Sequence, residues 1–225
     1  MRTRALALPF AAAVLLAITA CRSVSHSPSV ELFSGRDLTG WTPVLADPAV
    51  KPETVWSVKD GILICTGTPI GFVYSSQTVM NFRFVVEYRW PPGSKPGNSG
   101  VFSRIHDRFT AIPCCVEAQL LHGSAGDILG LQGMRLATNQ ARYFFVAHHA
   151  VAGDINGVKK LEDREAPPGE WNRVEVLAQG SAYTVWVNGH QVNSAVGVEV
   201  VAGHVGLQSE GGEIHFRRAT LTPLD

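Results

Sequence analysis

The chain has 225 residues, of which 45% are hydrophobic and 17% are charged. This length suits a single domain with a full hydrophobic core, and the composition excludes intrinsic disorder. Nineteen Lys and Arg balance nineteen Asp and Glu, so the neutral surface offers no broad attraction for a phosphate backbone and we expect no nucleic-acid partner.

The first element along the chain is an export signal. Arg2 and Arg4 precede an apolar run over residues 5–20. About sixteen residues are too few for a membrane span, which needs roughly twenty, so residues 1–20 are interpreted as a signal peptide. The sequence Ile18-Thr-Ala-Cys21 resembles the bacterial lipobox, in which the cysteine is lipidated; a plain signal peptide with a chance cysteine is the alternative. We therefore predict a lipid anchor at Cys21, a polar tether over residues 21–30, and a location in the bacterial cell envelope, on its periplasmic or outer-membrane face.

Residues 31–225 form the second part of the chain, a single β-rich domain. Short runs of β-branched and aromatic residues alternate with Gly, Pro, Asn and Asp, and no long helical period occurs. This pattern predicts an all-β sandwich. Strands are expected near residues 55–58, 62–66, 72–74, 82–90, 100–105, 116–121, 141–146, 171–178, 182–187, 204–209 and 214–221. Residues 122–140 and 147–170 are expected to be long irregular loops, which are often functional in compact sandwiches.

Cysteines and tryptophans of this domain are expected to be structural. Cys65, Cys114 and Cys115 are interpreted as small buried residues, with a disulfide between Cys65 and one of the adjacent pair as the alternative. No clear metal-ligand spacing occurs, so we assign no metal site, although His106, His122 and Glu210 could approach one another in the fold. The large aromatic side chains expected in the core rather than at a binding site are Trp41, Trp56, Trp171 and Trp186.

Strict alternation places polar side chains on one face of three predicted strands. If these strands line one concave sheet, the face becomes a hydrogen-bonding platform; a solvated outer face is the alternative. For Arg104 and Glu117, a cross-strand ion pair is a further interpretation. The polar positions are Asn98, Arg104 and His106 on the first strand, Glu117 and Gln119 on the second, and Gln208 and Glu210 on the third.

Eight short motifs occur in an order that resembles a known family. They are Phe33-Ser-Gly-Arg-Asp-Leu-Thr-Gly-Trp41, Trp56-Ser-Val-Lys-Asp-Gly-Ile62, Asn98-Ser-Gly-Val-Phe102 with Arg104, Glu117-Ala-Gln119, Gly169-Glu-Trp-Asn172, Val187-Asn-Gly189, Gly206-Leu-Gln208 and Phe216-Arg217. This set is similar to the 3-keto-disaccharide hydrolase domain family over roughly residues 31–225. The resemblance implies a concanavalin-like jelly roll of two antiparallel sheets and activity on sugars oxidised at carbon 3.

The chemistry that this resemblance implies differs from that of a paired-carboxylate glycosidase. A ketone at carbon 3 acidifies the carbon-2 proton, so one base can abstract it; the enolate then expels the glycosidic oxygen, and water can add. We expect Glu117 to be the base, with His122 as its rival, and Arg104 and Asn98 to stabilise the enolate oxygen. Gln119, Gln208 and Glu210 are expected to bind the substrate, and no cofactor is expected.

Two other functions remain open. A lectin-like module would use the same face to bind a glycan, oxidised or not, without cleaving it, and a surface lipoprotein would use the fold only as a scaffold. The family often has an imidazole at the position of Glu210 and an acid at that of His122. These two groups have either exchanged places, which would preserve the chemistry, or mark an altered or lost activity.

Overall fold

The computed structural model describes residues 28–225, so the predicted signal peptide and Cys21 lie outside the described residues. Apart from a 3-10 turn, η1 (Pro52–Thr54), the regular elements of this part of the chain are strands. Within it, no helix has the length and apolar character needed to cross a membrane.

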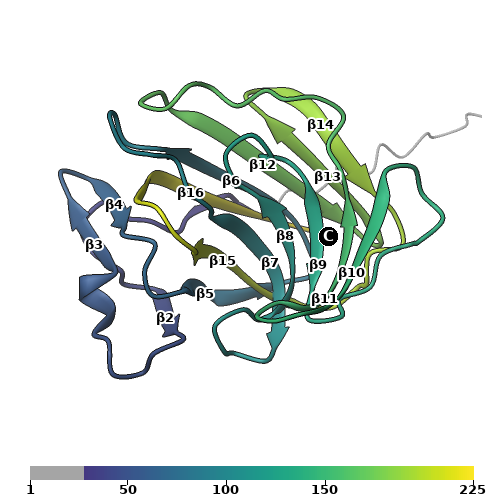
Figure 1. Cartoon of the computed structure of the whole chain (residues 1–225), viewed down its shortest axis with the longest axis horizontal. Coiled ribbons are helices and arrows are strands. Elements are labelled where there is room, and N and C mark those ends of the chain that lie inside the picture. The colour runs from purple at the N-terminus through teal and green to yellow at the C-terminus, as the bar shows by residue number, and fades with distance from the viewer. Residues whose placement is uncertain (1–27) are drawn as a thin grey trace, which may run out of the picture.

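Two antiparallel sheets lie one over the other in these residues (Figure 1). Sheet A has the order β14 (His190–Ala195), β13 (Ala182–Val187), β12 (Asn172–Gln179), β6 (Asn81–Arg89), β16 (Ile214–Leu224), β4 (Ile62–Cys65) and β3 (Trp56–Lys59), and β1 (Val30–Glu31) also pairs with β16. Sheet B has the order β10 (Tyr143–His149), β11 (Gly153–Val158), β9 (Ile128–Leu131), β8 (Cys114–Gln119), β7 (Gly100–Asp107), β15 (Gly203–Ser209), β5 (Gly71–Val79) and β2 (Trp41–Leu45). The predicted all-β jelly-roll sandwich is confirmed.

The main core lies between the sheets and follows from alternation along the strands. In β6, Phe82, Phe84 and Tyr88 are buried, while Arg83 and Arg89 point to the outer face. This is the pattern of a sheet with one face on the core and one toward water.

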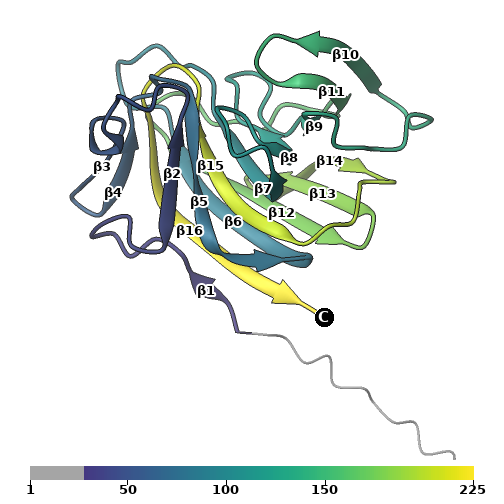
Figure 2. The ribbon, with the colours of Figure 1, turned by 90° about the horizontal axis from the view of Figure 1, so that it is seen from below.

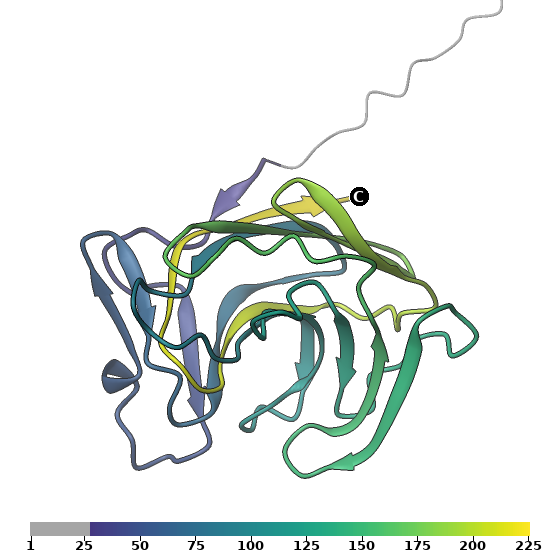
Figure 3. The ribbon, with the colours of Figure 1, turned by 45° about the horizontal axis from the view of Figure 1, so that its top comes forward.

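Sheet B differs because its outer face is also partly covered. Sheet B is strongly curved (Figure 3), and its outer face is the concave one. A second apolar cluster, which includes Phe72, Phe102, Cys115 and Leu131, fills part of this face. Polar groups placed beside that cluster are therefore shielded from water.

All the predicted strands are present, but the two segments expected to be irregular contain β9 and β11. That expectation was wrong because β11 is rich in turn-forming residues, Gly153-Asp-Ile-Asn-Gly157, and pairs with β9 and β10 all the same. The ring of Phe144 lies over Gly157, where a Cβ would be 2.1 Å from the ring. Close packing by a neighbouring strand thus overrides the local preference for a turn.

The tryptophan prediction is confirmed for two residues and wrong for two. Trp41 and Trp56 are buried. Trp171 is half-buried between two guanidinium groups, 4.6 Å from Arg89 and 4.4 Å from Arg217. Trp186 is half-buried on the outer face of sheet A, where it lines a groove. Trp171 is thus covered by charged side chains, and Trp186 shares its groove with Arg83 and Glu175.

The three cysteines of the described chain are free thiols. Cys65 and Cys115 are buried in different sheets, and Cys114 is partly buried. Burial raises the pKa of the Cys65 thiol to about 11. The cysteines are thus small structural residues rather than a disulfide.

Candidate functional site

Five of the predicted residues line one pocket on the concave face of sheet B. Its polar wall is Asn98, Glu117, Gln119, Gln208 and Glu210. The pocket has a volume of about 130 Å³, well below the several hundred Å³ of a drug-sized site, so it suits one sugar ring rather than a chain. Its other wall is mainly apolar and consists of Ile112, Leu129, Leu131, His149, Val151, Ala152 and Ile155.

A larger groove of about 620 Å³ lies on the outer face of sheet A, lined by Trp186 and by the pair Arg83–Glu175. Arg83 and Glu175 form an ion pair at 2.6 Å and neutralise each other. None of the residues predicted to be catalytic or to bind substrate lines this groove. The smaller pocket is therefore the better candidate, because it combines enclosure with titratable groups.

Glu117 lies at the centre of the polar wall. It is on β8, opposite Phe102 of β7 and Leu129 of β9, and is almost fully buried. Room for its carboxyl group comes from Gly100, where a Cβ would lie 2.1 Å from Glu117 Oε1. Burial raises the pKa of Glu117 well above its usual value, and the charges of Glu210 and Asp127 raise it further. Glu117 therefore favours its protonated form, and its Oε1 has no partner within the described protein.

Glu210 follows β15 and is a carboxyl group with two donors. Asn98 Nδ2 and Gln208 Nε2 donate to its Oε2, at 2.8 and 2.6 Å. Burial raises the pKa of Glu210, while the hydrogen bond from the Gln208 amide opposes that shift. The amide donors thus favour the ionised form of Glu210.

The carbonyl oxygens of the same two side-chain amides have no hydrogen-bond donor within the described protein. Asn98 Oδ1 and Gln208 Oε1 are buried and unpaired in the described residues, as is Glu117 Oε1. Buried polar atoms are normally hydrogen-bonded, so these three oxygens are acceptors for water or for a bound molecule that carries O–H or N–H donors. Gln119 differs, because its Oε1 accepts the N–H groups of Leu120 and Leu121 at 2.9 and 2.8 Å.

Arg104 is not part of this site, so the expected shared face is wrong for this residue. The register of β7 against β8 shifts after Ser103, and Arg104 has a φ of 53°. Its buried guanidinium donates to the carbonyl oxygens of Glu199 and Gly180, both at 2.6 Å. No ion pair joins it to Glu117. Beyond the bulge, His106 is exposed, with Nδ1 3.0 Å from the carbonyl oxygen of Arg104.

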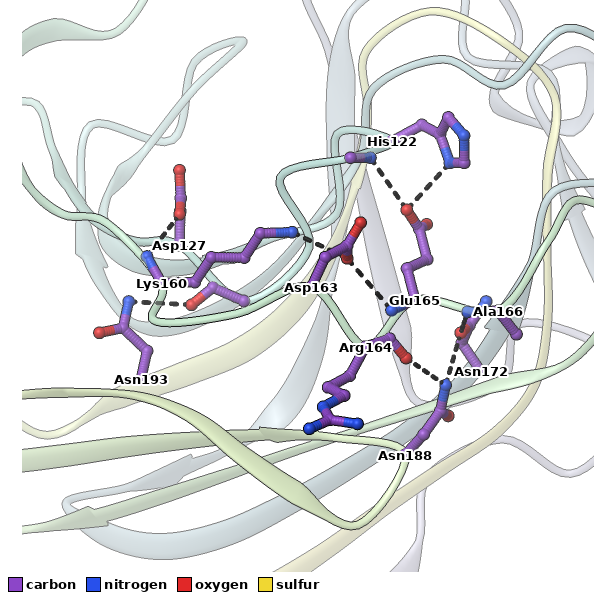
Figure 4. Close-up of polar contacts among 12 residues, drawn as sticks. His122, Asp127, Lys160, Asp163, Arg164, Glu165, Ala166, Asn172, Asn188 and Asn193 are labelled. Carbon is purple, nitrogen blue, oxygen red and sulfur yellow. Dashed lines mark hydrogen bonds and ion pairs between the residues drawn. The ribbon is translucent and has the colours of Figure 1, made fainter.

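His122 lies in a different cluster, shown in Figure 4. Glu165 Oε2 is 2.9 Å from His122 Nδ1 and accepts the N–H of Gly123 at 3.0 Å. Its Oε1 accepts from the Tyr88 hydroxyl and the Trp90 indole, both at 2.9 Å. This buried carboxylate holds the segment before β12 against the sandwich, and His122 does not line the pocket with Glu117.

No cluster of three or more potential metal ligands occurs in the part of the chain that the structure describes, and His106, His122 and Glu210 form none. The residue that sequence reasoning missed is His149, which lines the pocket from the end of β10. Its only signal was its place at the start of a long segment rich in Gly, Asp and Asn.

Several solved structures resemble this domain. A proposed glycosyl hydrolase from Parabacteroides distasonis is 20% identical, with a TM-score of 0.61 and coverage of 88% of this chain and 94% of that one. The carbohydrate-binding module CBM66 from Bacillus subtilis is 15% identical, with a TM-score of 0.55 and coverage of 80% and 93%. LamAcat from Zobellia galactanivorans is 10% identical, with a TM-score of 0.53 and coverage of 87% and 92%. At these low identities, the similarity to the three structures shows a shared fold alone.

No curated protein matches the chain at a significant level. The family comparison is more specific, because one domain description matches residues 28–222, nearly the whole described sandwich. The chain therefore belongs to the 3-keto-alpha-glucoside-1,2-lyase-like domain family.

Proposed function

We propose that this domain cleaves 3-keto-glycosides by elimination across carbons 1 and 2 of the oxidised sugar. Family membership indicates a hydrolase-like or binding function on carbohydrates. Support for the specific reaction comes from one observation, the pairing of two carboxyl groups in unlike environments within a single pocket.

The proton and the charge divide unequally between these carboxyl groups. Two neighbouring carboxyl groups in a shielded site do not both ionise, so they share one proton. Glu117 is almost fully buried without a donor, whereas Glu210 accepts two amide N–H groups. We therefore assign the proton to Glu117 and the negative charge to Glu210. This reverses the role expected from sequence, in which Glu117 was the base.

The reaction then proceeds with atoms and electrons in balance. Glu210 takes the proton from carbon 2, and the C–H electron pair moves onto the carbon-3 oxygen as an enolate. The enolate re-forms the ketone and a carbon 1–carbon 2 double bond while the bond from carbon 1 to the glycosidic oxygen breaks. Glu117 gives its proton to that oxygen. Addition of water to the enone completes a net hydrolysis.

Substrate binding uses the unpaired oxygens of the polar wall. Asn98 Oδ1 and Gln208 Oε1 accept ring hydroxyl groups, which supply the missing donors. The apolar wall packs against the C–H face of the ring. A pocket with these two walls selects one face and one edge of a single sugar.

The first test follows aglycone release from α- and β-anomers of an aryl 3-keto-glucoside and from their unoxidised parents. Release from a keto compound alone is the expected result, and release from the parent as well would contradict the elimination. Glu210→Gln and Glu117→Gln should each lose turnover, while Glu213→Gln, a change at an exposed residue nearby, should not.

A second function is favoured by the same unpaired oxygens, because they would hold a sugar whether or not it reacts. Binding of glycans without release from any keto compound would establish a lectin-like module.

We also propose that a lipid on Cys21 holds the domain at the bacterial cell envelope, because the residues before that cysteine match a lipoprotein signal.

A further inference from the structure

The proposed elimination needs a donor for the carbon-3 oxygen, and the groups expected for this role are not free. Arg104 donates to carbonyl groups outside the pocket. Asn98 Nδ2 and Gln208 Nε2 each donate one N–H to Glu210, so both amide nitrogens are held against the proposed base. The polar side chains of the pocket that remain are Gln119 and His149.

The ring of His149 has a defined tautomer. Its Nδ1 accepts the backbone N–H of Ala152 at 3.1 Å and that of Val151 at 3.4 Å. A ring nitrogen that accepts carries no proton, so in the neutral imidazole the proton is on Nε2. Nε2–H is then the one polar group of this ring that is available to a molecule in the pocket.

The turn that carries His149 is held in place over the pocket. The register between β10 and β11 shifts between Val146 and His149, and such bulges commonly re-aim a side chain beside a site. Gln132, directly after β9, holds this turn in place, because its Nε2 donates to Val151 O and its backbone N–H donates to Ala152 O, both at 2.8 Å. His149, Val151 and Ala152 all line the pocket. The ring is thus fixed by backbone groups of an anchored turn.

We propose that His149 is a catalytic residue whose Nε2–H donates a hydrogen bond to the enolate oxygen on carbon 3, a role that rests on the proposed function. When Glu210 takes the carbon-2 proton, the electron pair moves to that oxygen, and the Nε2–H bond stabilises the charge. His149 neither gains nor loses a proton in this step. The carboxyl groups that face it in the pocket, Glu210 and Glu117, perform the proton transfers.

The first experiment determines the tautomer without any turnover. The protein is labelled with ¹⁵N-histidine, and its imidazole signals are recorded at pH 8 alone and with 1,5-anhydroglucitol oxidised at carbon 3. This probe carries the ketone but no leaving group on carbon 1. We expect the Nε2–H form of His149 and a change in its Nε2 signal on binding. A proton on Nδ1, or an unchanged signal with the probe bound, would overturn the proposal.

The second experiment separates donation from packing. His149→Phe should lower kcat by about 10²–10³-fold, as expected for the loss of one donor to an oxyanion. His149→Gln retains an N–H donor and should recover part of that loss, whereas His148→Gln on the same turn should match the wild type. Wild-type turnover in His149→Phe would overturn the donor role of His149 and leave the proposed function of the domain standing. If the wild-type protein neither binds nor cleaves any 3-keto sugar, the proposed function falls and the donor role falls with it.

Discussion

At the residue scale, Glu117 makes folding dependent on pH. The pKa of its carboxyl group in the folded state is raised above 4.5, so the folded protein binds more protons than the unfolded chain once pH exceeds that value. The contribution of this group to stability is therefore complete below about pH 4.5 and is lost as pH rises toward its folded pKa.

Glu117→Gln should remove this dependence. The free energy of unfolding of the wild type should fall relative to that of the variant by up to about 1.4 kcal/mol for each pH unit above 4.5. Urea denaturation at several pH values from 4.5 to 8 measures this difference. Parallel curves for the two proteins would show that burial of Glu117 carries no such cost.

Gly100 is the residue that makes room for this carboxyl group. Gly100→Ala places a methyl group 2.1 Å from Glu117 Oε1, so we expect a loss of stability of about 1–3 kcal/mol, as for other overpacked sites. The same change should cost much less in a Glu117→Ala background, because the clashing atoms are gone. Chemical denaturation of the four proteins of this double-mutant cycle gives the coupling energy. Additive costs would mean that the two side chains do not compete for space.

Alternation along the strands was sufficient to predict most of the polar wall. Glu117, Gln119, Gln208 and Asn98 lie in or beside regular strands, where a period of two holds. The predicted position of Arg104 was wrong because this residue is left-handed and breaks that period, and no local signal in the sequence marks the bulge. His149 was missed because its position depends on a turn held by Gln132, which is about twenty residues away in sequence.

At the scale of elements, the bulge in β7 connects parts of the molecule that are distant in sequence. The Arg104 guanidinium joins the turn between β12 and β13 to the segment before β15. Lysine has one ammonium group and does not reproduce this planar fork. The bulge thus directs Arg104 toward these two segments, which its guanidinium holds together, and not toward the pocket.

Arg104→Lys should therefore destabilise the fold by about 1–3 kcal/mol through carbonyl groups left without donors, while turnover per folded molecule stays unchanged. Thermal unfolding and kcat at a temperature where the variant is fully folded measure the two effects. A fully folded variant with reduced kcat would return Arg104 to the list of site residues.

Strands were predicted correctly where hydrophobic runs were long. They were missed where a segment becomes a strand only because neighbouring strands pair with it. β6 and β12 were recognisable from their β-branched and aromatic residues. β9 has four residues, and β11 contains glycine, asparagine and aspartate. These two strands form because β8 and β10 offer partners on either side, and that information is not local.

At the scale of the whole molecule, the arrangement of the ends suits the proposed anchor. β1, where the described chain begins, lies on the side of the molecule opposite β10 and β11 (Figure 2). The wall of the pocket formed by β11 and the preceding turn is thus far from that end. The proposed lipid on Cys21 would therefore join the domain on the side remote from this wall.

Mass spectrometry of the protein isolated from bacterial membranes tests the anchor. We expect an N-terminal peptide that starts at residue 21 and carries a diacylglycerol group. Cys21→Ala should carry no acyl chains and should not be cleaved after Ala20. A mature protein that starts elsewhere, or that starts at Cys21 without lipid, would contradict the prediction.

The position of the last two strands governs when the domain can fold. β16 lies between β6 and β4 in sheet A, and β15 lies between β7 and β5 in sheet B. The middle of each sheet therefore cannot form until residues 203–224 have been synthesised, and these are among the last residues of the chain. At the usual pace of translation, β6 stays without this neighbour for roughly ten seconds. During that time no complete sandwich can form, so under the proposed export a newly made molecule would still be unfolded when residues 1–20 reach the export machinery.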